Sequence, residues 1–376
     1  MIIDKLSLSD FRLYKKSSFS FSPDVTVLLG SNASGKTNIL ESIFLLATGK
    51  SFKADSDREM IAFGREMGRV GGEIKQLNNE RIKLDILITA GEVSGIKTPF
   101  KKFSVNGVAK RMLDFAGILK VVLFWPEDLE LVTDSPSRRR KYLDFVLLQT
   151  DREYRRCLLS YEKGLRQRNR LLEAIRDEGA HRHQLIFWDQ LLIKNGEYIT
   201  KKREEYIDFV NNTQNSNDKI QNSNQIQNSK YQLIYDKSII SRVRLDQYKE
   251  EEVAAGVTLV GPHRDDLQFQ IQNSNYKSSS KSQIQNDNIR NLSHFGSRGE
   301  QRLAILWLKL GELSYIQQVT LEKPVLLLDD ILSELDHEHR KIIFEIIGNQ
   351  QTIMTTTDEH FIEKEKIKKC EIITLE

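Results

Sequence analysis

The stretch Gly30-Ser-Asn-Ala-Ser-Gly35-Lys36-Thr37 is the part of this sequence that decides its fold. It matches the spacing G-x-x-x-x-G-K-[ST], follows the apolar run Val25–Leu29, and precedes a helical pattern at Asn38–Ala47. Glycines let backbone N–H groups turn inward around phosphates, and the helix N-terminus adds the positive end of its dipole. The sequence therefore predicts a phosphate-binding loop between a buried strand and a helix.

The residues of this loop carry specific expectations. Lys36 is expected to reach the β- and γ-phosphates of a nucleoside triphosphate, and the Thr37 hydroxyl is expected to bind Mg²⁺. The predicted nucleotide-binding residues of the loop are Gly30, Ser31, Asn32, Ala33, Ser34, Gly35, Lys36, Thr37 and Asn38.

A second motif is the apolar strand 324–328, which ends in the carboxylates Asp329 and Asp330. An acidic residue at the carboxyl end of a parallel strand lies where such sheets bind ligands. Asp329 is therefore the candidate carboxylate on the Mg²⁺ side, and Asp330 is the candidate to orient or deprotonate an attacking water. A strand ending in acids is often only the start of a solvated loop, so this motif gains its weight from the phosphate-binding loop.

A third motif, Ser297-Arg-Gly299-Glu300-Gln301-Arg302, precedes a long helical pattern at Arg298–Gln318. Ser297 and Glu300 have the spacing of a capping box, so a purely structural role as a helix cap stays open. The functional alternative is that the Ser297 hydroxyl and the helix N-terminus bind a γ-phosphate.

Composition sets broad limits on the class of protein. The chain has 376 residues, 39% of them hydrophobic, and a net charge of only +3, so overall charge says little about partners. The cysteines Cys157 and Cys370 are too few for a disulfide framework, which fits the cytosol. We expect neither a signal peptide nor a membrane-spanning segment.

Hydrophobic periodicity divides the chain into an α/β head and an inserted helical lobe. Strand patterns dominate 1–131 and 257–376, which we predict to form one discontinuous head with a mixed sheet, while 132–256 is mainly helical. Helical stripes at Asp151–Arg176 and Gln184–Val210 could pair as a hairpin. The Asn/Gln-rich tracts 211–230 and 272–291 are predicted to be disordered loops.

The first of these helices predicts a basic stripe. On a helical wheel one face gathers Arg152, Arg155, Arg156, Lys163, Arg166 and Arg170. Such a stripe could follow the phosphates of DNA without reading its sequence, but a solvated face with internal ion pairs is equally common.

The order and spacing of these motifs resemble the ABC ATPase superfamily: a phosphate-binding loop, a serine–glycine helix start, an acidic strand, then Ser333-Glu-Leu-Asp336. Further segments are similar to the RecF family, an ABC/SMC-type group of P-loop ATPases. They are Trp125-Pro-Glu-Asp-Leu129, Ser135-Pro136 with Arg138-Arg-Arg140, Gln167-Arg-Asn169 and Gly261-Pro-His-Arg-Asp-Asp266.

This resemblance implies a cytoplasmic, ATP- and Mg²⁺-dependent protein of recombinational repair. It implies binding to single-stranded, double-stranded and gapped DNA, partners similar to RecR and RecO, and recombinase loading by a switch. It also implies an ATP-induced homodimer in which Ser297, Gly299 and Glu300 act in trans on nucleotide held by Lys36. Arg12 matches an arginine close to the nucleotide in SMC-type heads.

Two departures and three alternatives stay open. Asp330 stands where ABC ATPases have Glu, and Thr355-Thr-Thr-Asp358 stands where many have His. The shorter carboxylate implies slow turnover. We predict a slow, DNA-stimulated ATPase activity that works through a dimer. The alternatives are a transporter-type ABC subunit, a long-coiled-coil SMC protein and a small-molecule P-loop kinase.

Overall fold

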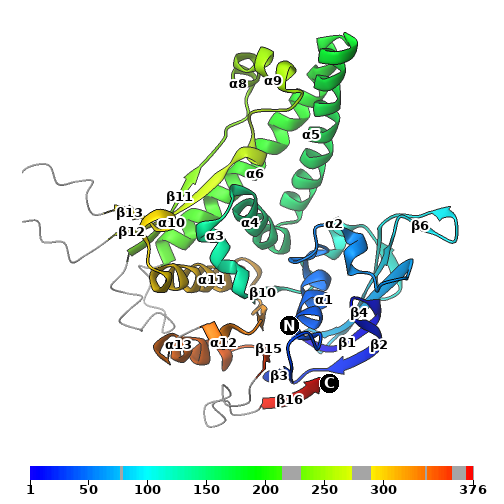
Figure 1. Cartoon of the computed structure of the whole chain (residues 1–376), viewed down its shortest axis with the longest axis vertical. Helices are drawn as coiled ribbons and strands as arrows, with labels where there is room; N and C mark the ends of the chain where they lie inside the picture. The colour runs from blue at the N-terminus through cyan, green and yellow to red at the C-terminus, as the bar shows by residue number, and fades with distance from the viewer. Residues whose placement is uncertain (77–78, 214–229, 273–288, 335–336, 358–369, 376) are drawn as a thin grey trace, which may run out of the picture. The chain divides into compact units, whose positions relative to one another are not determined.

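The computed structural model describes the chain except for residues 77–78, 214–229, 273–288, 335–336, 358–369 and 376. The described residues fall into two compact units (Figure 1). Unit 1 comprises Met1–Asp128 and Glu312–Glu376, and unit 2 comprises Leu129–Gly311. Among the described residues, no helix combines the length and apolar character that crossing a membrane requires.

A parallel sheet forms the centre of unit 1. Its strands run in the order β10 (Val121–Phe124), β14 (Val325–Leu328), β15 (Thr352–Thr356), β3 (Val25–Gly30) and β16 (Cys370–Leu375). Every residue of β10, β14 and β15 is buried, as expected for strands covered on both faces. Because these strands are parallel, the residues that follow β3 and β14 lie at the same edge of the sheet.

A second sheet in unit 1 is antiparallel throughout. Its order is β2 (Tyr14–Ser20), β1 (Ile2–Phe11), β4 (Met67–Lys75), β5 (Arg81–Thr89), β8 (Lys101–Val105) and β9 (Val108–Lys110). Helix α1 (Lys36–Thr48) lies against one face of it, close enough that a Cβ added to Gly72 would lie 2.6 Å from Leu46. The remaining short elements are β6 (Glu92–Val93), β7 (Ile96–Lys97), η1 (Asp57–Met60), α2 (Met112–Phe115), α12 (Ile331–Glu334) and α13 (His337–Ile347).

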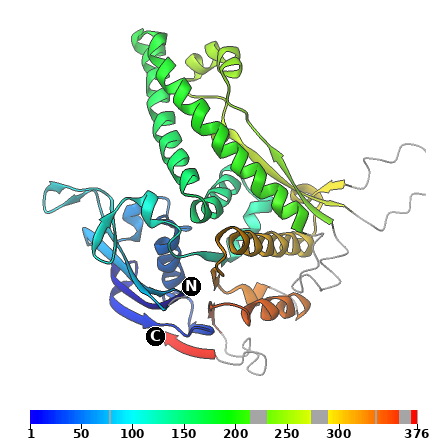
Figure 2. The same ribbon diagram turned by 180° about the vertical axis from the view of Figure 1, so that it is seen from behind.

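Unit 2 is built on a pair of long helices. Helices α5 (Arg152–Glu178) and α6 (Leu185–Thr213) pack side by side in both ribbon views (Figures 1 and 2). The other helices are α3 (Glu130–Thr133), α4 (Pro136–Thr150), α8 (Arg242–Gln247), α9 (Lys249–Ala255), α10 (Leu292–Phe295) and the first half of α11 (Arg298–Thr320). A three-stranded sheet joins β11 (Lys230–Asp236), β12 (Asp266–Gln272) and β13 (Ile289–Asn291); short turns are η3 (Arg182–Gln184) and η5 (Pro262–Arg264), while η2 (Pro126–Leu129) lies mostly in unit 1.

Buried charges tie the segments of unit 2 together. The guanidinium of Arg203 donates to the Pro262 carbonyl at 2.7 Å, to Asp265 at 2.9 Å and to Asp144 at 2.8 Å. Arg168 joins α5 to α9 by donating to Glu252 at 2.7 Å. Of the segments that the sequence analysis singled out, those around residues 138–144 and 261–266 are therefore joined through internal ion pairs, and Arg168 of the segment 167–169 forms its own with Glu252.

The division into units differs from the predicted one at its second boundary. Unit 2 extends to Gly311 and not to residue 256, because β12 pairs with β11 and the start of α11 belongs with them. The two Asn/Gln-rich tracts fall mostly outside the described residues, at 214–229 and 273–288. Their ends do form structure: 211–213 close α6, Lys230 begins β11, Gln272 ends β12 and 289–291 form β13.

Candidate nucleotide site

The predicted phosphate-binding loop has the geometry that phosphate binding requires. Gly35 adopts φ +97°, and a Cβ there would lie 2.6 Å from the Tyr14 hydroxyl. At Gly30 a Cβ would lie 2.6 Å from the Ser34 hydroxyl, so both glycines are needed for the tight turn. The Ser34 hydroxyl oxygen is buried without a hydrogen-bond partner in the described structure. The loop thus holds an unsatisfied polar group beside the start of α1.

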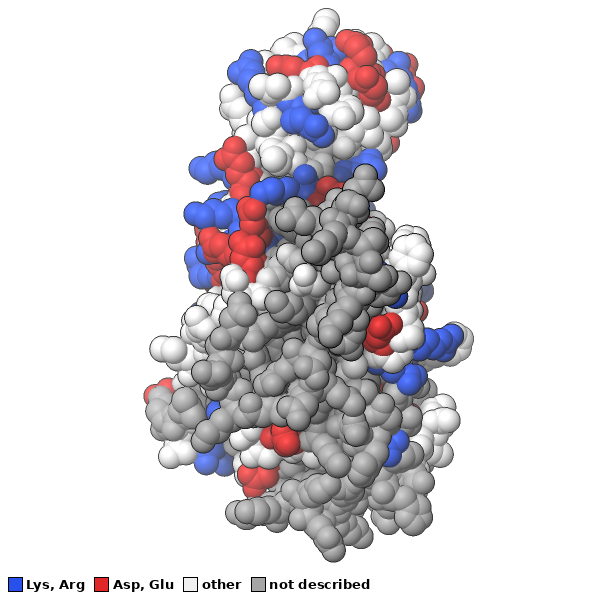
Figure 3. Space-filling view, turned by 90° about the vertical axis from the view of Figure 1, so that its left-hand side faces the viewer, with Lys and Arg blue, Asp and Glu red and all other residues white. Residues whose placement is uncertain are grey.

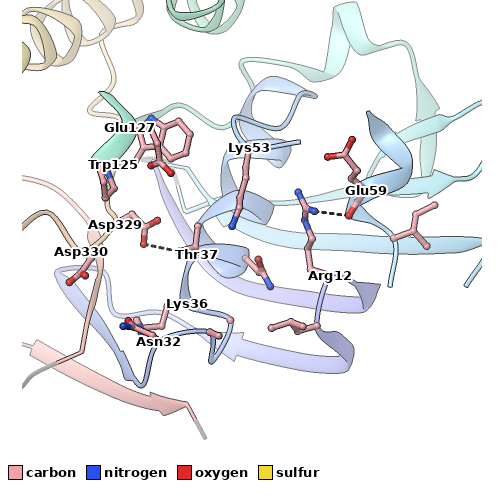
Figure 4. Close-up of a pocket in the computed structure, with 16 residues that line it drawn as sticks. Arg12, Asn32, Lys36, Thr37, Lys53, Glu59, Trp125, Glu127, Asp329 and Asp330 are labelled. Atoms are coloured by element: carbon pink, nitrogen blue, oxygen red, sulfur yellow. Dashed lines mark hydrogen bonds between the residues drawn. The ribbon is translucent and has the colours of Figure 1, made fainter. Parts of the chain in front are cut away.

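The loop opens onto a cleft of about 600 Å³. Figure 4 shows Asp329, Asp330, Trp125 and Glu127 at one end of the cleft, and Arg12 and Glu59 at the other. Residues predicted from the loop that line the cleft are Asn32, Ala33, Gly35, Lys36, Thr37 and Asn38. All lining residues belong to unit 1, so this unit forms the cleft by itself.

Lys36 is held inside the loop and has no carboxylate bound to it. Its amine donates to the carbonyls of Gly30 and Ser31, at 2.7 Å each. Burial lowers the pKa of Lys36, and the negative charges of Asp330 and Asp329 partly oppose that shift. An amine that rests on backbone carbonyls can turn to a phosphate oxygen, where it would find a charged partner.

Asp329 is the most unusual carboxylate of the cleft. It is buried, and burial raises its pKa. Its carboxylate accepts hydrogen bonds from the hydroxyls of Thr37 at 3.1 Å and Thr355 at 2.8 Å. The Thr37 hydroxyl and the Asp329 carboxylate are hard oxygen ligands that lie together, so these residues fit Mg²⁺, which would neutralise phosphate charge in this position.

Asp330, the predicted catalytic residue, comes directly after Asp329 in the chain. Its backbone has φ +49°, which is uncommon for a residue with a side chain, and its N–H donates to the Thr355 hydroxyl at 2.8 Å. Thr355 therefore contacts both aspartates. The sequence analysis noted Thr355 only as a departure from histidine, and nothing in the sequence signalled this bridging position.

Arg12 lines the cleft, but it is firmly tied to the protein. Its guanidinium donates to both carboxylate oxygens of Glu41, at 2.6 and 2.9 Å, and to the Glu59 carbonyl at 2.7 Å. Only 18% of its side chain is exposed. Lys53 was not predicted, and Figure 4 places it between Arg12 and Thr37. Arg12, Lys36 and Lys53 thus supply cations for a polyphosphate to a cleft that also holds four carboxylates, those of Glu59, Glu127, Asp329 and Asp330.

The serine–glycine helix start lies in unit 2. Ser297 and Glu300 form the capping box, because the Glu300 N–H donates to the Ser297 hydroxyl at 3.2 Å and the Ser297 N–H donates to Glu300 at 2.7 Å. Ser297 and Gly299 are exposed. The capping role is thus confirmed, and the role in trans stays a prediction. Of the segment Ser333–Asp336, residues 335–336 lie outside the described structure.

The basic stripe on α5 needs one correction. Arg155 is buried and donates to the Leu148 carbonyl, so it cannot belong to a surface that contacts DNA. The wheel misplaced it because α4 packs against that side of α5. Arg152, Lys163, Arg166 and Arg170 are exposed, and Arg156 pairs with Glu153 at 2.6 Å. On the side shown in Figure 3, basic and acidic side chains alternate over the helices of unit 2, which lowers the net positive charge of that surface.

Comparison with known proteins gives a consistent result over the whole chain. A family model described as the RecF/RecN/SMC N terminal domain matches residues 2–374. The DNA replication and repair protein RecF of Lachnoclostridium phytofermentans is 36% identical over 367 residues, covering 96% of this chain and 94% of that protein. RecF of Herpetosiphon aurantiacus is 36% identical over 378 residues, covering 95% and 94%.

Solved structures agree with these relatives. The recombination mediator protein RecF-ATP of the RecFOR pathway has a TM-score of 0.82 and 31% identity, covering 96% of this chain and 93% of that one. An Smc head domain from Pyrococcus furiosus has a TM-score of 0.52 at 16% identity, over 100% and 94%, which bears on the fold alone. Together they confirm the predicted fold class.

Proposed function

The chain belongs to the RecF family of DNA replication and repair proteins, and from that membership we propose that it is an ATP-dependent mediator of recombinational repair. The observation that carries this proposal is the cleft of unit 1, where Lys36, Thr37 and Asp329 meet as a site for a nucleotide with Mg²⁺. Relatives of this coverage favour the proposal over a transporter subunit or a small-molecule kinase.

ATP would bind with its phosphates in the loop 30–37. The Lys36 amine would leave the carbonyls of Gly30 and Ser31 for the phosphates, and Thr37 with Asp329 would hold Mg²⁺. Asp330 would orient the attacking water or accept its proton. Because Asp is shorter than Glu, we expect slow hydrolysis. We further expect DNA to stimulate it through the dimer.

We further propose that ATP closes a homodimer. The capping box presents the exposed Ser297 hydroxyl and the N-terminus of α11, which is a suitable anion site for the γ-phosphate held by a second copy. Nucleotide would then favour the closed state because only that state contacts the γ-phosphate from both sides. Such a switch could clamp gapped DNA and, with partners similar to RecR and RecO, promote recombinase loading.

Sedimentation velocity with and without ATP and gapped DNA tests this proposal. Lys36→Ala should abolish nucleotide binding or weaken it at least about 100-fold, because it removes the cation for the phosphates. Ser297→Ala should bind nucleotide as a monomer but not dimerise. An unchanged mass of the wild-type protein with every nucleotide would refute the dimer.

A second serine variant separates helix capping from the role in trans. Ser297→Asp keeps an N-cap acceptor but places a negative charge toward the γ-phosphate. Because the Ser297 hydroxyl also donates to the Glu300 carboxylate at 2.9 Å, the new carboxylate would face Glu300, so we expect Ser297→Asp to be less stable than the wild type, to remain folded at the assay temperature, and to fail to dimerise. If Ser297→Asp restores ATP-dependent dimers, Ser297 only caps α11.

The exposed part of the α5 stripe is our first candidate for DNA contact. Changing Arg152, Arg156 and Lys163 together to Glu should lower DNA affinity and weaken its salt dependence, since the log–log salt slope falls by about one unit for each phosphate that is no longer neutralised. Unaltered affinity at low salt would exclude the stripe.

A further inference from the structure

On the six-stranded sheet of unit 1, the side chains that face solvent differ from those on the buried side in both size and charge. On the buried side the register aligns Leu6, Gly72 and Leu84 beneath α1. On the opposite side it aligns Lys16, Ser9, Arg69, Leu87 and Lys102 in one cross-strand row. At about 4.8 Å per strand, this row spans about 19 Å.

A second row runs beside the first. It aligns Ser20, Lys5, Glu73 and Lys83. A third row, between these two, aligns Ser18, Ser7, Gly71 and Asp85. We call the exposed face formed by the three rows the outer sheet face. The basic side chains exposed on or beside it are Lys5, Lys16, Arg69, Arg81, Lys83 and Lys102.

Most of this positive charge has no internal partner. The side chains of Lys5, Lys16, Lys83 and Lys102 make no hydrogen bond or ion pair with another described residue. Arg69 pairs with Asp85 at 3.0 Å while remaining 59% exposed, and Arg81 approaches Asp4 at 3.6 Å. The acidic side chains of the three rows are Glu73 and Asp85, and Asp85 is buried.

General rules for sheets do not account for this pattern. An antiparallel sheet with one wet face is polar there, and lysines on an edge strand discourage pairing between molecules. The first rule explains polarity but not an excess of basic over acidic side chains, in a chain with 56 basic and 53 acidic residues. The second covers Lys16 on the edge strand β2, but not Lys83 or Arg69 on the interior strands β5 and β4.

We infer that the outer sheet face binds the phosphate backbone of DNA. The inference rests on the proposed function, which makes DNA a partner, and adds a surface in unit 1 to the stripe in unit 2. Unpaired lysines supply the counterion-releasing charge, and the hydroxyls of Ser9 and Ser18 can donate to phosphate oxygens. The three rows lie on strands and include no helix that could enter a groove, so this face would follow the backbone without reading bases.

The test is a charge reversal at the two ends of the longer row. Lys16→Glu with Lys102→Glu in the full chain changes two exposed, unpaired side chains, and Lys97→Glu with Lys249→Glu is the matched control with the same change in net charge away from the three rows. Binding of fluorescent single-stranded and duplex 30-mers would be followed by anisotropy from about 50 to 200 mM salt, a range over which phosphate contacts are strongly weakened.

We expect the K16E/K102E protein to bind at least about tenfold more weakly at low salt, with a log–log salt slope smaller by about two on duplex. The control should change by less than about threefold, because distant exposed charges are screened. Unchanged thermal stability and ATP affinity would show that the fold and the cleft are intact. A weakening on one probe alone identifies the DNA form that this face holds.

Equal affinity of K16E/K102E and the control for both probes would overturn the inference and leave the proposed function standing. A wild-type protein that binds neither probe, with or without ATP, would overturn both.

Discussion

Two buried aspartates, one in each unit, show how differently the same side chain can be used. Asp265 in unit 2 accepts hydrogen bonds from Arg203 at 2.9 Å, from the Ser238 N–H at 2.7 Å and from the Tyr235 hydroxyl. Asp329 in unit 1 accepts only from the hydroxyls of Thr37 and Thr355 among the described residues. Burial raises the pKa of both carboxyl groups.

The two aspartates differ in whether a cation is hydrogen-bonded to the carboxylate. In unit 2 the charge of Asp265 is neutralised inside the protein, so its network has nothing left to offer a ligand. In unit 1 the nearest cation of the loop, Lys36, rests on carbonyl oxygens. A buried charge without a bonded cation is costly to the fold, and such sites are typical of ligand binding. The comparison therefore assigns unit 2's cluster to stability and unit 1's cluster to function.

The contrast between the two aspartates predicts its largest effect on stability at Arg203, the cation bonded to Asp265. Arg203→Met keeps the length of the side chain but leaves the buried Asp265 and the partly buried Asp144 without their cation, so we expect the free energy of unfolding to fall by about 3–5 kcal/mol. Urea unfolding followed by circular dichroism measures it. A decrease below about 1 kcal/mol would mean that the network is not what holds unit 2 together.

The pH dependence of stability sharpens the same contrast. Burial lowers the pKa of His263 from 6.5 to about 4, with its ring between the Tyr161 hydroxyl at 2.8 Å and the Thr258 carbonyl at 3.0 Å. Between pH 6.5 and about 4 the unfolded chain binds a proton at this residue that the folded chain does not bind. Stability contributed by neutral His263 therefore falls as pH falls, at about 1.4 kcal/mol per pH unit and about 3 kcal/mol in total.

Urea unfolding of the wild type and of His263→Gln between about pH 7 and 4.5 measures this contribution. Glutamine does not titrate, so the variant should show the shallower decline even though it starts from a lower stability. Parallel curves for the two proteins would assign the acid sensitivity to other groups.

How far the sequence predicts this molecule follows from the kind of signal each residue gives. Strands β3 and β14 and helices α5 and α6 fall within a few residues of their predicted ranges, because their apolar runs or periods are unbroken. Strand β4 was missed because its three glycines, Gly68, Gly71 and Gly72, interrupt the alternation that marks a strand. Strand β16 was missed although it pairs with β3 along its length.

The residues of the candidate site likewise divide into those that a local sequence pattern predicted and those whose place depends on the whole fold. Lys36, Thr37 and Asp329 were predicted because their spacing is fixed by local chemistry. Folding of distant segments alone brings Lys53 to the cleft and Thr355 to the two aspartates, so no local pattern marked them. The burial of Arg155 was likewise set by packing against another helix, which a helical wheel does not include.

Asp329→Asn tests how much folding stability is lost by burying the Asp329 carboxylate without a bonded cation. Because burial raises the pKa of Asp329, its ionised form is disfavoured in the folded protein, and this penalty grows as pH rises. Asparagine still accepts from both hydroxyls, so we expect nucleotide-free stability near neutral pH to rise by about 1 kcal/mol. Mg²⁺-dependent ATP affinity should fall at least about tenfold, because the carboxylate ligand is removed. Thermal unfolding and nucleotide titration with and without Mg²⁺ measure the two effects.

Asp265→Asn is the matched control for that substitution. It removes the charge that Arg203 neutralises, so it should lower stability and leave Mg²⁺-dependent nucleotide affinity unchanged. If both variants shift stability in the same direction, the distinction between the two aspartates fails.

The smallest expected effect concerns Thr355, whose hydroxyl donates to Asp329 and accepts from the Asp330 N–H at 2.8 Å each. Thr355→Val keeps the shape and leaves that N–H unsatisfied, so ATP hydrolysis and Mg²⁺-dependent affinity should fall about fivefold, or about 1 kcal/mol. Thr355→Ser restores the hydroxyl without the methyl group and should recover most of the activity. Recovery separates orientation of the carboxylates from packing, because a serine that behaved like valine would assign the effect to the missing methyl group.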